Sequence, residues 1–337
     1  MANVTTTDLR TSLASPPDPT QTYFVRSLLM NAEIPLMYER WGDSESLPGN
    51  EGRNIIFRRY AHLPLAGQLT QGVPPTGQTP VPTDFTVALI QHGDFVALTD
   101  MARWTQKDPI LNKFTELLGL QAGYTYDTYL RDIVVNGTTV LFSNGAARTD
   151  VVTIPDGNDL DRMIRQLRLN GAETQLGGNQ GSGIENTYPV LPAYPVVIHP
   201  RTWFTFQNIS GCKDAAQYRG AASGEIGRYK ELAFFLATDP SSLGVGAPVV
   251  TASGGASAAV TNTGGTVDVF STVAFGKHGY HRVKLNGKSM SYHAKPLGSA
   301  GTADPLDQIG TNGWKSTGAG LITNNAWICR LEHATEL

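Results

Sequence analysis

The stretch that decides the fold is residues 304 to 315, Asp304-Pro305-Leu306-Asp307-Gln308-Ile309-Gly310-Thr311-Asn312-Gly313-Trp314-Lys315. It contains an Asp-Pro-Leu start, and two glycines, Gly310 and Gly313, precede Trp314 and Lys315. Two shorter blocks precede it, Phe275-Gly276-Lys277-His278-Gly279-Tyr280 and Lys295-Pro296-Leu297-Gly298. The last third of the chain is therefore predicted to alternate between strands and turns, with residues 267 to 270 and 281 to 285 as the clearest strands.

The most regular helical pattern lies upstream, over residues 109 to 134. Asp108 can cap this helix, and Pro109 suits its first position. The apolar residues on helical spacing are Ile110, Phe114, Leu117, Leu118, Tyr129, Leu130, Ile133 and Val134. A helix of this length would extend roughly 39 Å. Periodicity alone leaves open whether it is the core helix of an ordinary α+β protein or the spine of a shell subunit.

Residues 54 to 92 are predicted to form a projecting hairpin. Strand-like stretches at 54 to 60 and 85 to 90 flank a tip rich in proline and glycine. A tip of some 20 residues with little structure of its own is uncommon inside a compact domain, and we favour contact with a partner. The alternative is a surface loop with incidental apolar residues. The candidate contact residues are Leu63, Leu65, Leu69, Val73, Pro75, Thr76 and Gly77.

The remaining chain divides into an N-terminal stretch and a mixed region. Residues 1 to 53 are polar and proline-broken at the start, which predicts an extended arm with one or two short helices. After a short strand at 139 to 142, Asn158 or Asp159 can cap a helix that Gly171 ends. Further strands are predicted at 195 to 200 and 232 to 237, and polar or small-residue loops at 174 to 187 and 241 to 266.

Composition bounds the class of protein. Charged residues make up 16% of the chain, below the roughly 25% of typical soluble domains, which fits either a subunit covered by neighbours or a globule of low charge. The net charge of -3 and the lack of a basic run argue against specific DNA recognition. Cys212 and Cys329 are expected to be reduced. Without a secretion signal or a long apolar run, the chain is expected to be made in a cytoplasm.

Sequence motifs for catalysis or cofactor binding are missing: no Walker loop, dinucleotide fingerprint, nucleophile elbow or zincin motif occurs. His278 and His281 lack nearby partners for a metal site. Residues 156 to 161 resemble half of a calcium loop without its terminal Glu, and a turn with a helix cap explains them. Nothing in the sequence gathers Asp304, Asp307 and His333 around a cleft. We expect no catalytic, cofactor-binding or metal-binding residues and no enzyme activity.

In their order along the chain, the C-terminal blocks resemble the major capsid (coat) proteins of tailed bacteriophages of the N-four type. In that family a similar acidic-Pro-Leu-x-Gln block, a Gly and a Gly-Trp-Lys precede a run similar to residues 321 to 332. Asp307 is a mild departure, because the family often has Asn there. The structural motif residues are Gly276, Lys277, Tyr280, Asp304, Pro305, Leu306, Gln308, Gly313, Trp314 and Lys315.

Upstream blocks extend the resemblance to about residues 54 to 332. The projecting hairpin of that family is similar to residues 75 to 80 and 91 to 93. A pattern shared more widely among coat proteins of this fold is similar to His199-Pro200 and to residues 224 to 227. The resemblance implies an α+β chain with a Hong Kong 97-like phage capsid fold. Its parts would be an N-terminal arm (1–53), an extended β-hairpin loop (54–92), a peripheral domain with the spine helix (93–145), an axial domain (146–270) and return strands completing both sheets (271–337).

The resemblance also implies a function. The chain would self-assemble, as hexamers and pentamers, into the icosahedral shell around the double-stranded DNA of a phage, after synthesis in the bacterial host cytoplasm. Expected partners are a separate scaffolding protein, since the 53-residue arm is too short for a fused one, together with a portal, a cement or decoration protein and non-specifically bound DNA, but no membrane. The extended loop lacks lysine, so this chain is not expected to form the isopeptide crosslinks of some relatives.

Three alternatives remain from the sequence. A phage tail or decoration protein would usually lack a long spine helix followed by a mixed domain. A cellular nanocompartment shell protein would share the fold but lack the C-terminal blocks. An unrecognised α+β enzyme would need a convergent site that the sequence does not indicate.

Overall fold

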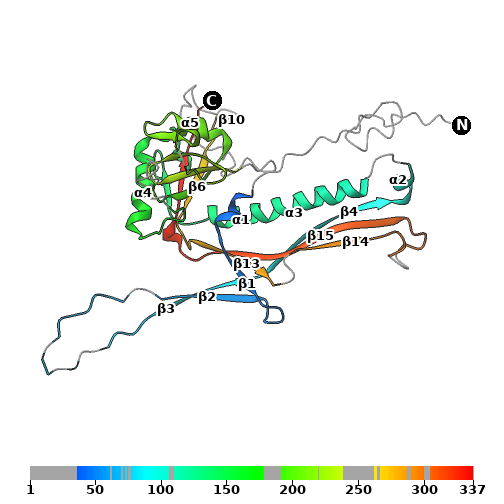
Figure 1. Cartoon of the computed structure of the whole chain (residues 1–337), viewed down its shortest axis with the longest axis horizontal. Coiled ribbons are helices and arrows are strands. Elements are labelled where there is room, and N and C mark those ends of the chain that lie inside the picture. Colours follow the sequence, from blue (N-terminus) through cyan, green and yellow to red (C-terminus); the bar gives the residue numbers. More distant parts are fainter. Residues whose placement is uncertain are drawn as a thin grey trace, which may run out of the picture.

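The computed structural model describes residues 36–60, 63–69, 71–72, 74, 77–105, 110–177, 191–218, 220–237, 262–263, 266–286, 290–299 and 304–336. The predicted arm before residue 36, the cap at Asp108 and Pro109, and most of the loops predicted at 174 to 187 and 241 to 266 lie outside these residues. Within them the chain has a body at one end, a long sheet that extends away from it, and a hairpin that projects from the base of that sheet (Figure 1).

The long sheet has five strands built around β15 (Ile309–Ile322). This strand pairs antiparallel with β4 (Ile90–Thr99), β13 (Tyr280–Leu285) and β14 (Met290–Lys295). Strand β1 (Asp43–Leu47) adds to the edge in parallel with β13. The predicted strand at 281 to 285 is confirmed, and the quoted motif 304 to 315 leads from a turn into the central strand.

Helix α3 (Ile110–Val135) covers one face of the long sheet along its length (Figure 1). The predicted helix is confirmed over its described part, although Leu117 is exposed rather than buried. The residues turned inward are four apart and all buried: Leu118, Ala122, Tyr126, Leu130 and Val134. Such a stripe is typical of a helix packed along one line against a sheet.

Glycines in β15 allow this helix to lie close to the sheet. A Cβ at Gly318 would lie 2.6 Å from Cε2 of Tyr126, and a Cβ at Gly320 would lie 2.7 Å from Cδ2 of Leu130. Real Cβ atoms do not approach other atoms so closely, because interiors are already packed to crystal-like density. The absence of side chains at these two positions therefore sets the spacing between helix and sheet.

The body is a seven-stranded sheet, here called the body sheet, in the order β5-β16-β12-β6-β9-β8-β7. Its strands are β5 (Val140–Phe142), β16 (Ile328–His333), β12 (Phe270–Phe275), β6 (Tyr194–Ile198), β9 (Leu232–Leu236), β8 (Glu225–Tyr229) and β7 (Cys212–Asp214). The central strands are buried along their whole length, as expected for strands covered on both faces. The predicted strands at 139 to 142, 195 to 200 and 232 to 237 are confirmed to within two residues.

One strand prediction is wrong. Residues 267 to 270 do not form a single strand, since the two-residue β11 (Thr266–Val267) pairs with β10 (Asn262–Thr263) and β12 starts only at Phe270. The apolar run continues past the predicted end because β12 is buried between β16 and β6. Alternation marks half-buried strands, so it locates the start and end of a fully buried strand poorly.

Helix α4 (Gly157–Leu169) packs on the body sheet through Leu160, Met163, Ile164 and Leu167. Its cap is Asp156, whose carboxylate accepts a hydrogen bond of 2.9 Å from the backbone N–H of Asp159. Asp159 accepts one in return from the N–H of Asp156, so it is the reciprocal partner of the cap and not the cap itself. Residues 156 to 161 are thus a helix start, as the sequence indicated.

Shorter elements complete the described chain. The hairpin consists of β2 (Asn54–Tyr60) and β3 (Pro82–Ala88), paired antiparallel from Asn54 with Ala88 to Tyr60 with Pro82. The remaining helices are α1 (Met37–Trp41), α2 (Asp100–Thr105) and α5 (Trp203–Gln207), and single 3-10 turns lie at Arg148–Asp150, Pro200–Thr202, Ala215–Gln217 and Asn325–Trp327.

Residues 1 to 53 are predicted to form an extended arm with one or two short helices, and α1 is such a helix within its described part. That described part is, however, packed against the rest of the chain. From residue 36 the chain enters the core, because α1 buries Met37, Tyr38 and Trp41 and β1 joins the long sheet. These three apolar residues are spaced to share one side of a helical turn, a signal too short to stand out in a proline-rich stretch.

We expect Gly320→Val to destabilise the subunit by about 1–3 kcal/mol, because the added side chain overpacks the contact between β15 and α3. The matched control is Gly119→Ala on α3, where a Cβ meets nothing within 4 Å and helix propensity should add about 0.5–1 kcal/mol of stability. Urea denaturation followed by circular dichroism measures both, and equal stability of Gly320→Val and wild type would contradict the close-packing argument.

Candidate interaction surfaces

The base of the hairpin is anchored to the long sheet. Ile55, Phe57 and Val87 pack against a small buried cluster that includes Leu89 and Val283. The ring of Phe57 also lies 4.9 Å from that of His281. Alternate residues of β2 and β3 are thus half-buried while those between them are exposed, so the hairpin has one supported face and one free face.

The tip of the hairpin, residues 61 to 81, combines exposure with a lack of charge. It contains no Asp, Glu, Lys or Arg. The side chains of Leu63, Leu65 and Leu69 are 56%, 97% and 71% exposed. A two-stranded hairpin is at best marginally stable alone in water, and an uncharged apolar projection of this size usually marks an interaction site.

Four of the predicted contact residues are therefore placed as expected on an exposed tip: Leu63, Leu65, Leu69 and Gly77. Val73, Pro75 and Thr76 lie outside the described residues. Contact of the tip with a partner stays a prediction, since the described chain is a single subunit.

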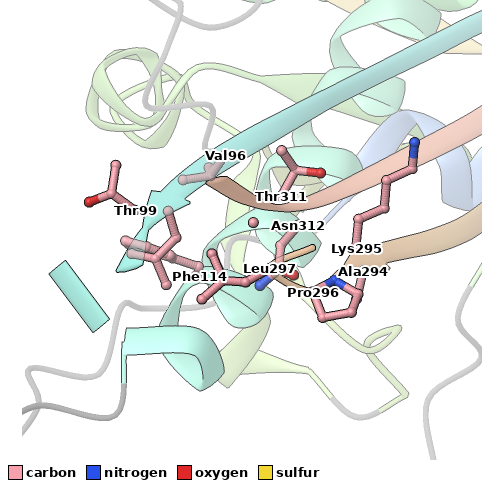
Figure 2. A pocket seen from close by; sticks show the side chains of 11 residues that line it. Val96, Thr99, Phe114, Ala294, Lys295, Pro296, Leu297, Thr311 and Asn312 are labelled. Atoms are coloured by element: carbon pink, nitrogen blue, oxygen red, sulfur yellow. The ribbon is translucent and has the colours of Figure 1, made fainter. Parts of the chain in front are cut away.

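The far end of the long sheet carries an apolar hollow of about 220 Å³ (Figure 2). Its walls come from β4, β14, β15, the start of α3 and the turn after β14. The lining residues are Val96, Leu98, Thr99, Phe114, Ala294, Lys295, Pro296, Leu297, Gly310, Thr311 and Asn312. Phe95, Met101, Trp104 and Leu306 add exposed apolar side chains to the same end of the subunit. This end and the hairpin tip lie at opposite extremes of the molecule (Figure 1).

The Gly-Trp-Lys part of the sequence motif lies in the middle of β15. Trp314 is 5% exposed and packs against Leu118 and Ala122 of α3. Its indole N–H donates to Oε1 of Gln121 at 3.1 Å, and the amide of Gln121 donates to Asp94 of β4 at 2.6 Å. The motif tryptophan therefore ties the spine helix to two strands of the sheet, while Lys315 is exposed.

The Gly276-Lys277 and Tyr280 part lies where the chain passes from the body sheet to the long sheet. The N–H of Gly276 donates to the carbonyl of Trp327 at 2.7 Å, and that of Lys277 to Glu173 at 2.9 Å. The buried Tyr280 hydroxyl donates to the carbonyl of Tyr38 at 2.6 Å. These residues therefore join the two sheets.

The acidic turn lies at the other end of the long sheet. The carboxylate of Asp304 accepts from the N–H of Ile309 at 2.7 Å, and the carbonyl of Gln308 accepts from the N–H of Asp100 at 3.0 Å. Leu306 is 75% exposed at the tip of this turn, next to Pro305. The turn holds β15 in register with the end of β4.

The titratable residues weighed in the sequence do not form a site. His333 is buried in the body sheet, where burial lowers its pKa to about 4, whereas Asp304 and Asp307 lie at the far end of the long sheet. His278 and His281 both approach Asp43, at 2.5 Å and 3.7 Å. Across the described residues, no group of three or more His, Cys, Asp or Glu side chains could hold a metal ion.

Both thiols are free, and burial raises the pKa of Cys212 to about 11 and that of Cys329 to about 12. Thiols held protonated in this way are poor nucleophiles. Among the described helices, none combines the length and apolar character needed to span a bilayer.

Comparison with models of protein families found no match to this sequence. Comparison with curated proteins also found none. Solved structures, in contrast, match over nearly the whole chain. The capsid of Ralstonia phage GP4 is 11% identical with a TM-score of 0.63, covering 96% of this chain and 98% of that one. The capsid of cyanophage P-SCSP1u is 13% identical with a TM-score of 0.61, covering 93% of each chain.

An encapsulin is similar as well. The encapsulin in a complex from Synechococcus elongatus is 9% identical with a TM-score of 0.52, covering 98% of this chain and 96% of that one. At such identities the likeness shows the fold, so the expected α+β, Hong Kong 97-like architecture is confirmed. The narrower resemblance to the N-four type stays an interpretation of the sequence blocks.

We expect the buried motif residues to contribute to stability and the exposed ones to contribute little. Trp314→Ala should cost about 3–5 kcal/mol, because it removes a buried indole between α3 and β15. Lys277→Ala should change stability by less than about 0.5 kcal/mol, because its pair with Glu173 is largely exposed. Chemical denaturation of both variants checks this contrast, and a small effect of Trp314→Ala would contradict it.

Proposed function

We propose that this chain, which has the fold found in phage capsids, is a major capsid protein that self-assembles into an icosahedral shell around double-stranded phage DNA. The observation that carries the proposal is the uncharged, apolar hairpin tip at one extreme of the subunit and the apolar hollow at the other. A subunit cannot bring its own extremes together, so in the proposed shell each surface would be covered by another copy.

Contact between two different surfaces of identical subunits is head-to-tail, and repetition of it by rotation closes a ring. We infer that the tip of one copy lies over the long sheet of its neighbour and that the apolar far end takes part in the contact. Such rings would be the hexamers and pentamers of the shell. In this arrangement residues 54–92 act as the extended loop, 93–145 as the peripheral domain with its spine helix, and 146–270 as the axial domain, completed by strands from 271–337.

The proposal gives the subunit a structural role and no catalytic one. Among the described candidates, Asp304 holds a turn, His278 and His281 approach Asp43, and His333 and Cys329 are buried in the body sheet. The proposed partners are other copies of this chain, a separate scaffolding protein, a portal and a cement or decoration protein. The packaged DNA would be contacted non-specifically, which the net charge of -3 supports.

A cellular nanocompartment shell is the second candidate, because the encapsulin has a similar fold. The ordered C-terminal blocks, including residues 304 to 315, favour the phage reading. The two differ in contents: purified particles from infected cells would hold double-stranded DNA in the first case and cargo protein in the second.

We expect Leu65→Asp to block shell formation while leaving the fold intact. The side chain is 97% exposed in the subunit, so its replacement does not disturb the core, but a charge in a buried contact is strongly unfavourable. Negative-stain electron microscopy of the chain, expressed alone and with a scaffolding protein, measures assembly, and the melting temperature measures folding. The matched control is Leu169→Asp, which changes a 76% exposed leucine on α4 in the same way and should assemble better. Uniform closed shells from Leu65→Asp would rule out docking of the tip.

We also expect the mature shell to be held without covalent crosslinks. The segment 54–92 contains no lysine, so it cannot supply the amine of an isopeptide bond with a neighbouring subunit. Denaturing gels of mature particles should show the coat protein as a monomer band, and a ladder of coat oligomers would contradict the expectation.

A further inference from the structure

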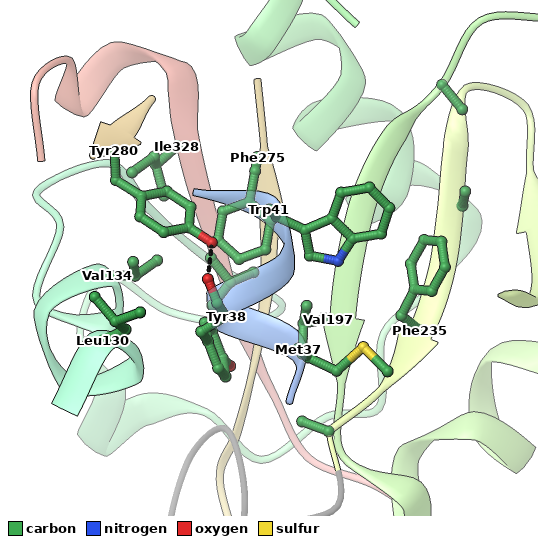
Figure 3. Close-up of a cluster of buried hydrophobic side chains, with 14 of the residues drawn as sticks. Met37, Tyr38, Trp41, Leu130, Val134, Val197, Phe235, Phe275, Tyr280 and Ile328 are labelled. Atoms are coloured by element: carbon green, nitrogen blue, oxygen red, sulfur yellow. Dashed lines mark hydrogen bonds between the residues drawn. The ribbon is translucent and has the colours of Figure 1, made fainter. Parts of the chain in front are cut away.

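The short helix α1 occupies the corner where three parts of the subunit meet (Figure 3). Its residues Met37, Tyr38 and Trp41 are only 4%, 1% and 8% exposed. They share one buried cluster with α3, the long sheet and the body sheet. Helix α3 contributes Tyr126, Leu130 and Val134, and the long sheet contributes Tyr280. The body sheet contributes Val197, Ala233, Phe235, Val273, Phe275 and Ile328.

Polar contacts attach α1 to the spine helix and the long sheet. One carboxylate oxygen of Asp127, on α3, accepts from the N–H groups of Tyr38 at 2.9 Å and Glu39 at 3.0 Å. The hydroxyl of Tyr280 donates to the carbonyl of Tyr38 (Figure 3). Glu39 pairs with Arg282 at 2.7 Å and with Lys284, both on β13.

A second set of contacts attaches α1 to the body. The amide of Gln175 donates to the carbonyl of Trp41 at 2.8 Å, and the guanidinium of Arg40 donates to the carbonyl of Ser223 at 2.6 Å. The indole of Trp41 lies 4.8 Å from the ring of Phe235. Five consecutive residues therefore touch both sheets and the helix between them.

Within the described residues, the backbone crosses between the long sheet and the body through short connections at residues 136–139, 276–279 and 323–327. Short connections between two packed units are where a hinge would bend. Since α1 fills the corner beside these connections, its seat restricts that bending.

We propose that α1 is a conformational wedge: its seating sets the angle between the long sheet and the body sheet, and Asp127 is the positioning residue that holds it in place. The chain before residue 36 and the hairpin that follows β1 are attached to the two ends of this segment. A contact made by either one is thereby coupled to the angle between the sheets, and so to the curvature that a subunit would impose on an assembly. The inference concerns the isolated subunit and holds whether or not the chain forms shells.

The electrostatics of the corner give the wedge a measurable signature. Burial raises the pKa of Asp127 to about 6, while the N–H donors of α1 lower it and the nearby charge of Glu39 raises it further. The other charged or titratable groups of the corner are Tyr38 and Arg40 of α1, Asp43 of β1 with His278 and His281 beside it, Tyr126 and Arg131 of α3, and Tyr280, Arg282 and Lys284 of β13. We expect the pKa of Asp127 to fall toward its ordinary value, near 4, when α1 leaves, because the carboxyl group then loses the burial that raises it.

The two pKa values of Asp127, with α1 seated and with α1 detached, determine how pH affects the seating of α1. The seated state binds the proton of Asp127 more tightly, so acid favours seating, and this preference is lost as the pH rises through 6. Opening of α1 should therefore be about tenfold more frequent at pH 7.5 than at pH 5. Asp127→Asn keeps an oxygen that can accept both N–H groups but cannot ionise, so its opening should not change over this range.

The experiment measures the exchange of the Tyr38 and Glu39 amides together with the distance between the two sheets. Spin labels at Arg165→Cys on α4 and Lys315→Cys on β15, both exposed, report that distance in the full-length Cys212→Ser chain. Asp127→Ala removes the acceptor of both N–H groups. It should speed their exchange roughly tenfold, the usual effect of losing a helix cap, and broaden the distance distribution.

The matched control is Asp156→Ala, which removes the cap of α4 inside the body. It should lower the melting temperature yet leave both the α1 amides and the distance unchanged. Faster exchange in Asp127→Ala with an unchanged distance would overturn the wedge, because α1 would then be a passive attachment. Equal broadening in Asp156→Ala would overturn it as well. If Asp127→Ala does not fold, Asp127→Asn still tests the proposal. If its Tyr38 and Glu39 amides exchange with the same pH dependence as in wild type, Asp127 is not the residue that holds α1 in place.

Discussion

The close approach of α3 to β15 is the contact on which the rest of the structure depends. Gly318 and Gly320 remove the side chains that would keep the helix away, and Trp314 fills the space further along. Because β15 pairs with three other strands, fixing the helix on it fixes the whole long sheet. The helix also contributes to both ends of the long sheet. Phe114 lines the hollow at the far end, and Asp127 binds α1 at the joint with the body.

This arrangement separates the rigid parts of the subunit from those that need a partner. The body sheet and the contact between α3 and β15 bury their apolar side chains within one chain. The hairpin tip and the far end of the long sheet leave theirs exposed. A soluble monomer would gain from charges at such places, yet the tip has none between Tyr60 and Pro82. The distribution of charge, more than the number of apolar residues, is what marks the hairpin tip as a candidate interaction surface.

Much of this could be predicted from the sequence, and the reasons are local. The spine helix shows apolar residues at helical spacing over a long stretch, and the hairpin has two flanking strands around a proline-rich tip. The motif tryptophan lies in an ordered series of sequence blocks. What escaped prediction depends on contacts between distant residues. The core position of α1 requires Asp127 and Tyr280, which lie 89 and 242 residues from Tyr38. The hollow is formed by three strands and a helix start, and no local sequence pattern predicts that these elements meet.

The motif residues explain why a sequence pattern could indicate a fold without indicating any chemistry. Glycine is required in β15 because the helix lies against the strand, and tryptophan because one large side chain must span the gap from α3 to the sheet. Glycine and tyrosine are required at the joint because the chain must turn there and hold the carbonyl of Tyr38. Most other positions need only be apolar inside and polar outside, a condition that many sequences satisfy. A fold maintained by so few specific contacts can keep its shape while most of its sequence changes, as the capsid structures that are 11% and 13% identical illustrate.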